Sequence, residues 1–480
     1  MKKFSITLSV ATVLLFFFLS YQVYVPFQSD YSEGWNATRQ IMVLNGVPLY
    51  SAPPHFMQTN YPPLWFHCIA LLAELFGCNP DIMGRLVSLA ALFSLAGLAM
   101  QLTCRVTGRQ SAGVTAAALF LLLYALELPV RVAENDPQPL GMLLEMTGLL
   151  LALSSHDSKK SLYASAFFFA LAVFFKPNLI GVPAGIGLAL LANRNWKQFA
   201  IWSLLGVTGT ALLYALTITI DGPYFMAHLF SPRTYSLHDA VYKDLRFTLI
   251  RNFPFIALSA LWCWHSRVNT TKRLLGSVWL CTHLAAFYFT GGDGVAFNIF
   301  FECLWLDSIL SVCALVTFPA SWSAFTPTAF RLSIAACALV LLIRFPVGLV
   351  SSAIQWHQSA TNSASYLNAT ALLRGIKGDV VCENLLMCVD AGKISLFDPY
   401  FLRGQIKKGL YPQDMMEKLL ALPTTQAIEI GDTSNPVNPK YRYDRIPAKV
   451  YTWLTAHYKL AYQTPTVAIW VRHASTKEGP

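Results

Sequence analysis

Long apolar runs alternate with short polar segments over most of the chain. The runs cover residues 4–25, 64–76, 83–102, 112–126, 139–153, 162–175, 179–192, 199–220, 253–264, 274–290, 299–319 and 332–350. A helix needs about 20 apolar residues to cross the roughly 30 Å of bilayer hydrocarbon. The run 64–76 is too short for this and contains His67 and Glu74, so we expect it to lie in the interface after Pro62-Pro63. The pattern predicts an α-helical membrane protein with about 11 transmembrane helices and one interfacial helix.

Basic residues fall in alternate loops of this pattern. They are Lys2, Lys3, Arg105, Arg109, Lys159, Lys160, Arg194, Lys197, Arg267, Lys272, Arg273 and Arg331. Cytoplasmic loops of membrane proteins carry such an excess of lysine and arginine. An odd number of spans with a cytoplasmic N-terminus puts all of these residues inside. It also puts segments 26–81, 130–138, 176–177, 221–249 and 291–298 outside, together with everything after residue 351. We therefore expect a multi-pass protein of the inner (plasma) membrane.

The composition becomes that of a soluble protein from about residue 355 onward. Segments 380–383, 427–430 and 467–471 have the pattern of short buried strands, and 364–375, 415–422 and 448–457 have that of helices. We expect a transmembrane domain over 1–354 and a small extracytoplasmic (periplasmic) α/β domain over 355–480. Cys382 and Cys388 lie in this second part. A disulfide between them would require an oxidising compartment, and the sequence leaves the pairing open.

Composition supports the membrane assignment. The chain has 480 residues, of which 55% are hydrophobic and only 12% charged. A soluble protein of this length carries far more charge. The formal net charge of +10 is explained by the cytoplasmic loops. Because no basic run with interleaved aromatic residues is found, we expect no nucleic-acid partner.

Asp30 and Glu33 stand about five residues beyond the first apolar run, at the predicted outer boundary of the membrane. Their spacing puts both side chains on one face of a helix. Paired carboxylates there suit the binding of a cation or the removal of a proton from a nucleophile. A capping box, with Asp30 as N-cap and Glu33 at the third position, fits equally well. Topology favours chemistry, because it places the pair on the same face as Asp136 and Lys176.

Further charged residues collect in the predicted outer loops, whereas the inner loops have no comparable set. They are Arg39, His55, Glu134, Asp136, Lys176, Arg246, Arg251 and Asp293, with Glu302 about one turn inside a span. This layout suits a substrate with an anionic head at the interface and an apolar tail in the lipid. Lysine and arginine would bind the phosphate, and the carboxylates would act on an incoming hydroxyl.

Short motifs follow one another through these loops. They are Asp-Tyr-Ser-Glu-Gly-Trp-Asn-Ala at 30–37, Leu-Asn-Gly-Val-Pro-Leu-Tyr at 44–50, Asn-Tyr-Pro-Pro-Leu-Trp at 60–65, Glu-Asn-Asp-Pro at 134–137, Phe-Phe-Lys-Pro-Asn at 174–178 and Gly-Gly-Asp-Gly-Val-Ala-Phe-Asn at 291–298. In order and placement the chain resembles the multi-spanning GT-C glycosyltransferases. The resemblance is to the bacterial branch related to family 39, the protein O-mannosyltransferases, and to the lipid A aminoarabinose transferases. The family's usual acid pair stands here as Asp30-x-x-Glu33, which leaves open which carboxylate matches the essential acid.

The resemblance implies an inverting hexosyl- or pentosyltransferase. Its donor would be a polyprenyl-phosphate-linked sugar, and its acceptor a lipid, glycan or protein on the non-cytoplasmic face. The implied catalytic carboxylates, with Asp30 as first choice, are Asp30, Glu33 and Asp136. The implied ligands of the donor phosphate are Lys176, Arg39, Arg246 and Arg251. Other candidates are Glu134, Asp293 and Glu302.

A divalent metal ion is the expected cofactor candidate. The carboxylates of Asp30 and Asp136 alone would favour Mg²⁺ or Mn²⁺, and the addition of His55 would favour Zn²⁺. No nucleotide is expected. Structural explanations stand beside these roles, since Asp136-Pro137 can cap a helix and Lys176 can reach the interface from a helix end. Asp293, between glycines, fits a turn.

The alternative function is a secondary transporter of a small polar or anionic solute, because many apolar runs with scattered intramembrane charge are common there. The odd number of spans, the acids in the outer loops and the soluble C-terminal part favour the enzyme.

Overall fold

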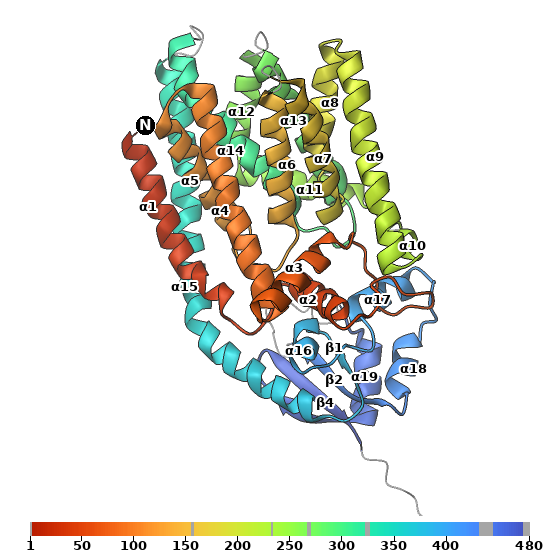
Figure 1. Cartoon of the computed structure of the whole chain (residues 1–480). Coiled ribbons are helices and arrows are strands. Elements are labelled where there is room, and N and C mark those ends of the chain that lie inside the picture. The colour runs from red at the N-terminus through yellow and green to blue at the C-terminus, as the bar shows by residue number, and fades with distance from the viewer. Residues whose placement is uncertain are drawn as a thin grey trace, which may run out of the picture.

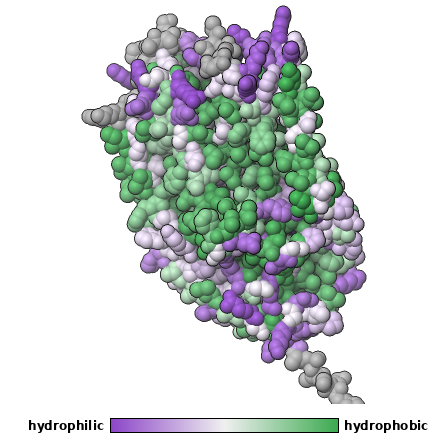
Figure 2. All heavy atoms as spheres, in the orientation of Figure 1, coloured by the Kyte–Doolittle hydropathy of each residue, from purple (hydrophilic) through white to green (hydrophobic). Residues whose placement is uncertain are grey.

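The computed structural model describes residues 2–154, 158–231, 234–265, 270–321, 327–431 and 445–473. A bundle of long helices carries a small α/β domain at one end, and α1 begins at the opposite end (Figure 1). On the face shown in Figure 2, hydrophobic side chains form a broad belt across the bundle, with hydrophilic side chains at both ends. Such a belt is what a bilayer requires of the surface that it covers, and the chain is a multi-pass membrane protein.

Every predicted apolar run forms a helix. The helices are α1 (Lys2–Leu19), α3 (Leu64–Phe76), α4 (Pro80–Thr107), α5 (Gln110–Glu127), α6 (Gln138–Leu153), α7 (Lys159–Phe175), α8 (Gly181–Ala192), α9 (Trp196–Asp221), α12 (Phe253–His265), α13 (Thr270–Thr290), α14 (Phe301–Ser321) and α15 (Pro327–Gly375). Among the described residues, 6 helices are long and apolar enough to cross a membrane, or 7 if the bent pair 237–251 and 253–265 is one span. The number of 11 spans and the orientation of the termini remain predictions.

Helices α6 and α8 are among the short helices of the bundle. They have 16 and 12 residues, which is about 24 and 18 Å of helix against roughly 30 Å of hydrocarbon. In Figure 1, α6 and α7 stop short of the level that α4 and α9 reach, and α2 (Tyr31–Leu44) and α3 lie across the space beneath them. The loops at the ends of α6 and α7 are therefore recessed into the bundle.

The first outer loop supplies α2 and α3. Helix α3 follows Pro63 and ends at Gly77, whose φ of +62° suits glycine because that residue has no Cβ. Its bounds agree with the predicted short helix. Trp65 and Phe66 on α3 pack with Trp35 on α2 in one buried cluster. Short helices follow later in the outer loops: α10 (Phe225–Leu229) and α11 (Leu237–Leu245), and the 3-10 turn η5 (Phe297–Phe300).

The C-terminal domain contains a four-stranded sheet in the order β1-β2-β4-β3. Its elements are β1 (Asp379–Cys382), α16 (Leu385–Asp390), α17 (Pro399–Lys407), α18 (Met415–Ala421), β2 (Thr425–Gly431), α19 (Ala448–His457), β3 (Tyr458–Gln463) and β4 (Val467–Arg472). Strands β1 and β2 are parallel, and the other pairs are antiparallel. The predicted small α/β domain is thus present. Helix α15 passes without a break through the boundary proposed at 354/355.

A disulfide joins Cys382 at the end of β1 to Cys388 in α16. Helix α16 packs against α2, so this pair of elements connects the outer domain to the helix that carries Glu33. A Cβ on Gly34 would lie 2.5 Å from the Leu386 backbone nitrogen, which shows how closely α2 and α16 approach. The outer domain is therefore part of the surroundings of the first outer loop.

Candidate active site

Arg131 is the centre of the charged site. Its guanidinium contacts three carboxylates: Asp30 at 3.2 Å, Glu134 at 2.6 Å and Asp136 at 3.1 Å. Lys176 Nζ reaches the far side of Asp136 at 3.1 Å. We call these five residues the Arg131 cluster. They come from the start of α2, the loop between α5 and α6, and the end of α7, so the fold brings Asp30, Asp136 and Lys176 together.

Asp30 is the most open carboxylate of the Arg131 cluster. It is the N-cap of α2, and its Oδ1 accepts hydrogen bonds from Ser32 N at 3.0 Å and Ser32 Oγ at 2.7 Å. Its side chain is 36% exposed, whereas that of Asp136 is 6% exposed. Burial tends to raise the pKa of the Asp30 carboxyl, but Arg131 and the Ser32 hydrogen bonds outweigh burial and lower that pKa. Asp30 is therefore an ionised carboxylate with one accessible side.

Glu134 and Asp136 have closed surroundings. Glu134 is in hydrogen-bond contact with Ser32 Oγ as well; because the single proton of Ser32 Oγ goes to Asp30, a protonated Glu134 is the donor in this contact. Burial raises the pKa of Glu134 well above its ordinary value, and the charges of Asp30 and Asp136 add to the rise although Arg131 opposes it. Asp136 Oδ1 accepts a hydrogen bond from Gln138 N, at the start of α6, at 2.6 Å. Helix capping and the contact with Lys176 thus coexist at Asp136.

Glu33 is placed differently from Asp30. It is fully buried, and its oxygens accept from Arg85 Nε at 2.7 Å and Arg85 Nη2 at 2.9 Å. It also accepts from the backbone N–H groups of Ser29 at 2.7 Å and Asn135 at 3.1 Å. We call Glu33, Arg85 and the neighbouring Asp81, 3.2 Å from Arg85, the Arg85 cluster. This ion pair gives Glu33 a structural explanation, because no oxygen of its carboxylate remains for a substrate.

The predicted phosphate ligands fall into two groups. Lys176, Arg246 and Arg251 all border η5: the two guanidiniums lie 5.3 and 4.8 Å from the Phe297 ring. In the amide orientation that satisfies both of its polar atoms, Asn298 accepts from Lys176 Nζ at 3.0 Å. Arg251 also forms an ion pair with the buried Glu127. Three of the four candidate cations thus surround one turn.

Arg39 lies apart from that group. Its side chain is fully buried, stacks 4.2 Å from the Trp35 ring, and donates to the carbonyls of Gln58 at 2.8 Å and Trp35 at 3.3 Å. These contacts hold the first outer loop together. The guanidinium is enclosed by protein, and it does not join Lys176 as the sequence had led us to expect.

The predicted metal ligands are not assembled. His55 stacks on His228 at 4.2 Å and on Phe401 of α17 at 5.6 Å, away from the contacts that Asp30 and Asp136 make. Those two carboxylates share Arg131, a fixed cation. Among the described residues, no group of three or more His, Cys, Asp and Glu side chains is arranged to hold a metal ion. The side chains present therefore do not fit the predicted metal site.

The two remaining candidates differ in surroundings. Asp293 is exposed in the turn before η5, where the Tyr400 hydroxyl donates to it at 3.4 Å. Glu302 is buried in the first turn of α14 and lies within hydrogen-bond reach of Glu145 on α6. Sequence reasoning overlooked Glu145, although an acid in the middle of an apolar helix is a recognisable signal. It also overlooked Arg131 as the centre of the site, although Glu134 and Asp136 follow it within five residues of the sequence.

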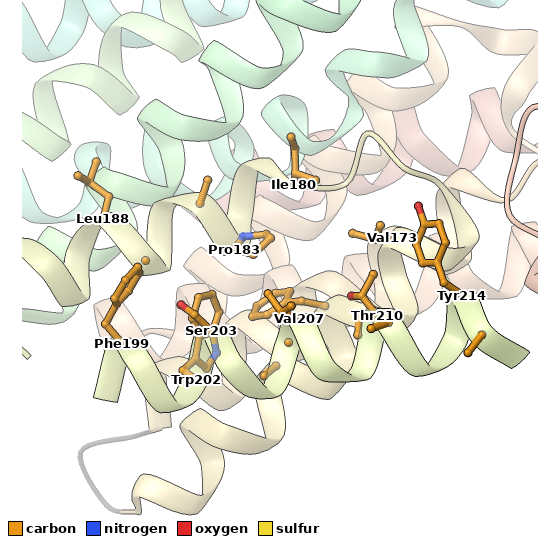
Figure 3. A pocket seen from close by; sticks show the side chains of 18 of the residues that line it. Val173, Ile180, Pro183, Leu188, Phe199, Trp202, Ser203, Val207, Thr210 and Tyr214 are labelled. Carbon is orange, nitrogen blue, oxygen red and sulfur yellow. The ribbon is translucent and has the colours of Figure 1, made fainter. Parts of the chain in front are cut away.

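An apolar groove adjoins the α7–α8 connection that carries Lys176. It has a volume of about 1090 Å³ and lies between α7, α8 and α9 (Figure 3). Val173 and Ile180 line it on either side of the connection, and Phe199 and Tyr214 line it along α9 (Figure 3). From Phe199 to Ile218 the α9 wall extends for about 28 Å. The groove therefore follows most of the thickness of the hydrocarbon layer.

No protein-family model and no curated protein matches the chain. Solved structures do match it. ArnT from Cupriavidus metallidurans bound to undecaprenyl phosphate is 14% identical, with 97% of each chain covered and a TM-score of 0.60. The apo state of that ArnT is 14% identical, with 98% of each chain covered and a TM-score of 0.63.

An archaeal structure has the same architecture. The Archaeoglobus fulgidus oligosaccharyltransferase in complex with Zn and sulfate is 12% identical, with a TM-score of 0.51 over 98% of this chain and 73% of that chain. These similarities extend over the bundle and the outer domain. They confirm the predicted fold, an α-helical membrane bundle with a small C-terminal α/β domain, which this chain shares with ArnT.

Proposed function

We propose that this protein is an inverting glycosyltransferase of the inner membrane. It would move a hexosyl or pentosyl group from a polyprenyl-phosphate donor to a lipid, glycan or protein acceptor on the non-cytoplasmic side. One observation carries the proposal: Asp30 is an ionised, partly exposed carboxylate, and Arg131 and Asp136 connect it to Lys176. A base for a hydroxyl and a cation for a phosphate thus stand at one site in the GT-C fold.

Asp30 acts on the acceptor. Its free oxygen accepts the proton of the acceptor hydroxyl, while Arg131 and Ser32 hold its other oxygen in place. The acceptor oxygen forms a bond to the anomeric carbon of the sugar. The bond between that carbon and the phosphate oxygen breaks, and its electron pair leaves with the polyprenyl phosphate. A single displacement of this kind inverts the configuration of the anomeric carbon.

Lys176 acts on the leaving group. The departing phosphate gains negative charge, which a buried ammonium stabilises strongly because little water competes for it. Arg246 and Arg251, on the other border of η5, supply further positive charge. The apolar groove between α7, α8 and α9 supports a lipid donor, because its length exceeds the depth of one leaflet, about 15 Å or half of the hydrocarbon thickness. A polyprenyl chain could lie there with its phosphate near the α7–α8 connection.

Arg131 supplies the positive charge between Asp30 and Asp136, where the sequence had pointed to a metal ion. The neighbouring archaeal enzyme was crystallised with Zn, but the residues of this chain do not assemble such a site among the described positions. We therefore assign the positioning of Asp30 to Arg131 and derive no step from a metal.

Reconstitution tests this function. The purified protein in proteoliposomes is supplied with undecaprenyl-phosphate hexose, pentose and N-acetylhexosamine in separate assays, together with envelope lipid and glycan acceptors. Release of undecaprenyl phosphate together with a glycosylated acceptor, whose anomeric configuration is opposite to that of the donor by NMR, supports the proposal. Transport of a solute across the bilayer without any release of undecaprenyl phosphate contradicts it.

A further inference from the structure

Several buried polar side chains beside Lys176 have unsatisfied hydrogen-bonding atoms. Both amide atoms of Gln138, Nδ2 of Asn178 and one oxygen of Glu302 have no hydrogen-bond partner among the described residues, and the two oxygens of Glu145 have only Glu302 and the Val182 backbone within reach. Gln138, Glu145 and Glu302 are at most 4% exposed. We call Gln138, Glu145, Asn178 and Glu302 the buried polar cluster.

These side chains converge from three elements. Gln138 and Glu145 are seven residues apart on α6, so they share one face of that helix. Gly141 lies on the same face, where a Cβ would come within 2.6 Å of Leu179 Cδ1. That face therefore looks at the α7–α8 connection, which carries Asn178. Glu302 approaches from α14, close enough to Lys176 for their charges to interact.

With protein atoms as its only partners, the buried polar cluster lowers the stability of the folded protein. Glu145 and Glu302 lie within hydrogen-bond reach of each other, so two buried carboxyl groups meet between α6 and α14. The remaining donors and acceptors still need partners, because an unsatisfied buried polar atom costs about 1–3 kcal/mol. Water can fill this role, and hydroxyl groups of a ligand that replace the water can fill it equally well.

We propose that the buried polar cluster binds the hydroxyl groups of the transferred sugar and sets the sugar specificity. The inference rests on the proposed function. A sugar is one bond from its phosphate, so a phosphate at Lys176 brings the sugar within reach of the side chains around Lys176. The amide groups of Gln138 and Asn178 and the carboxyl groups of Glu145 and Glu302 offer both donors and acceptors, which is what a polyhydroxylated ring requires. Undecaprenyl phosphate without a sugar has no hydroxyl groups to form hydrogen bonds with these donors and acceptors.

Binding measurements on the full-length protein in nanodiscs test the inference. The ligands are undecaprenyl phosphate and the same lipid loaded with hexose, pentose or N-acetylhexosamine. For the wild type, we expect at least one loaded lipid to bind about tenfold or more tightly than undecaprenyl phosphate. We expect Glu302→Gln and Gln138→Leu each to reduce that sugar-dependent gain by about tenfold, the equivalent of one hydrogen bond. The affinity of Gln138→Leu for undecaprenyl phosphate should change less than twofold, and that of Glu302→Gln should not fall, because this variant removes a negative charge that faces Lys176.

Asp307→Asn is the matched control. Asp307 is fully buried on the same helix as Glu302, but its partners lie on α13: Oδ1 accepts from Trp279 Nε1 at 2.7 Å, and Oδ2 lies 3.3 Å from His283 Nε2. This variant should keep the sugar-dependent gain. The inference would be overturned if Glu302→Gln lost affinity for the bare and the sugar-loaded lipid equally. It would also be overturned if this variant had a lower unfolding temperature but kept the full sugar-dependent gain in affinity. Either result would show that the cluster is hydrated and purely structural. If the wild type binds no polyprenyl phosphate, loaded or bare, the proposed function fails, and this inference fails with it.

Discussion

The Arg131 cluster and the Arg85 cluster are built alike but differ in how far their α2 carboxylate is exposed. Each has a buried arginine that neutralises carboxylates from distant segments, and each takes one carboxylate from the same turn of α2. In the Arg85 cluster the carboxylate, Glu33, is fully enclosed and all its contacts are with protein. In the Arg131 cluster the carboxylate, Asp30, keeps 36% of its side chain exposed.

The difference shows how one helix start can serve structure and chemistry together. Glu33 fixes α2 to α4 through Arg85, and this anchor orients the N-cap that precedes it. Asp30 then needs no partner beyond Arg131 and Ser32 to hold its position, so one of its sides remains free. The two carboxylates are three residues apart, yet one is suited to stability and the other to reaction.

Asp30→Asn gives the largest expected effect. Asparagine is as good an N-cap as aspartate, so the hydrogen bond to Ser32 N should survive while the charge is lost. We expect kcat for sugar transfer to fall by about 10²–10⁴-fold, the usual contribution of a positioned base, with an unfolding temperature close to that of the wild type. Asp239→Asn is the control and should retain activity, because the Asp239 side chain is 56% exposed. Full activity of Asp30→Asn would remove Asp30 from the mechanism.

Glu33→Gln should give the opposite pattern. It leaves the buried Arg85 charge with Asp81 alone, and the loss of one partner from a buried ion pair costs about 3–5 kcal/mol. We expect a lower unfolding temperature and less folded protein in detergent, with much less change in kcat per folded molecule than in Asp30→Asn. Glu74→Gln, at an exposed acid of α3, should change neither quantity. A Glu33→Gln variant of normal stability but without activity would reverse our assignment of the two carboxylates.

Much of the fold was predictable because apolar periodicity reports local structure. Helices α3 and α19 have the bounds that the sequence predicted. Strand β3 was missed: it follows α19 directly, and most of its side chains are exposed, so no buried run marks it. The sequence also predicted a span that ends at residue 350 and a separate helix over 364–375, whereas one continuous helix, α15, covers both segments.

From the sequence, only the membrane face on which the site lies was predictable. Positive charge in the inner loops placed Asp30, Asp136 and Lys176 on one side, and the structure brings them together through contacts of 3.1 to 3.2 Å. The choice of partners was not predictable. Glu33 pairs with Arg85, 52 positions away, and neither residue's local sequence distinguishes this anchor from a free carboxylate. Partner choice depends on how α2 packs on α4, which no local pattern records.

Gly34→Ala tests the contact between α2 and α16, and we expect a smaller loss of stability than in Glu33→Gln. Its Cβ would lie 2.5 Å from the backbone nitrogen of Leu386 and 2.2 Å from Gln28 Oε1. The backbone of α16 cannot move without shifting the outer domain, so we expect a loss of about 1–3 kcal/mol, the usual cost of overpacking. Unfolding measurements and protease sensitivity of the outer domain would record it. Gly404→Ala is the control, since nothing lies within 4 Å of its Cβ position. An unchanged unfolding temperature would show that α2 and α16 are not in firm contact.

The smallest expected effect is a pH dependence of the contact between the first outer loop and the outer domain. His55 stacks on His228, and no carboxylate among the described residues pairs with it. Burial, with His228 adding to it, lowers the pKa of His55 to about 4. The unfolded chain binds a proton near pH 6.5, so between about pH 6.5 and pH 4 it holds more protons at His55 than the folded protein does. The contact between the first outer loop and Phe401 should therefore lose stability as pH falls through this window. Unfolding temperatures measured at pH 7 and pH 5 should differ less in His55→Phe, which keeps the stacking ring and cannot be protonated. An equal difference in the two proteins would assign the pH dependence to other groups, and acid sensitivity would then have to be sought in the carboxylates that the two arginines hold.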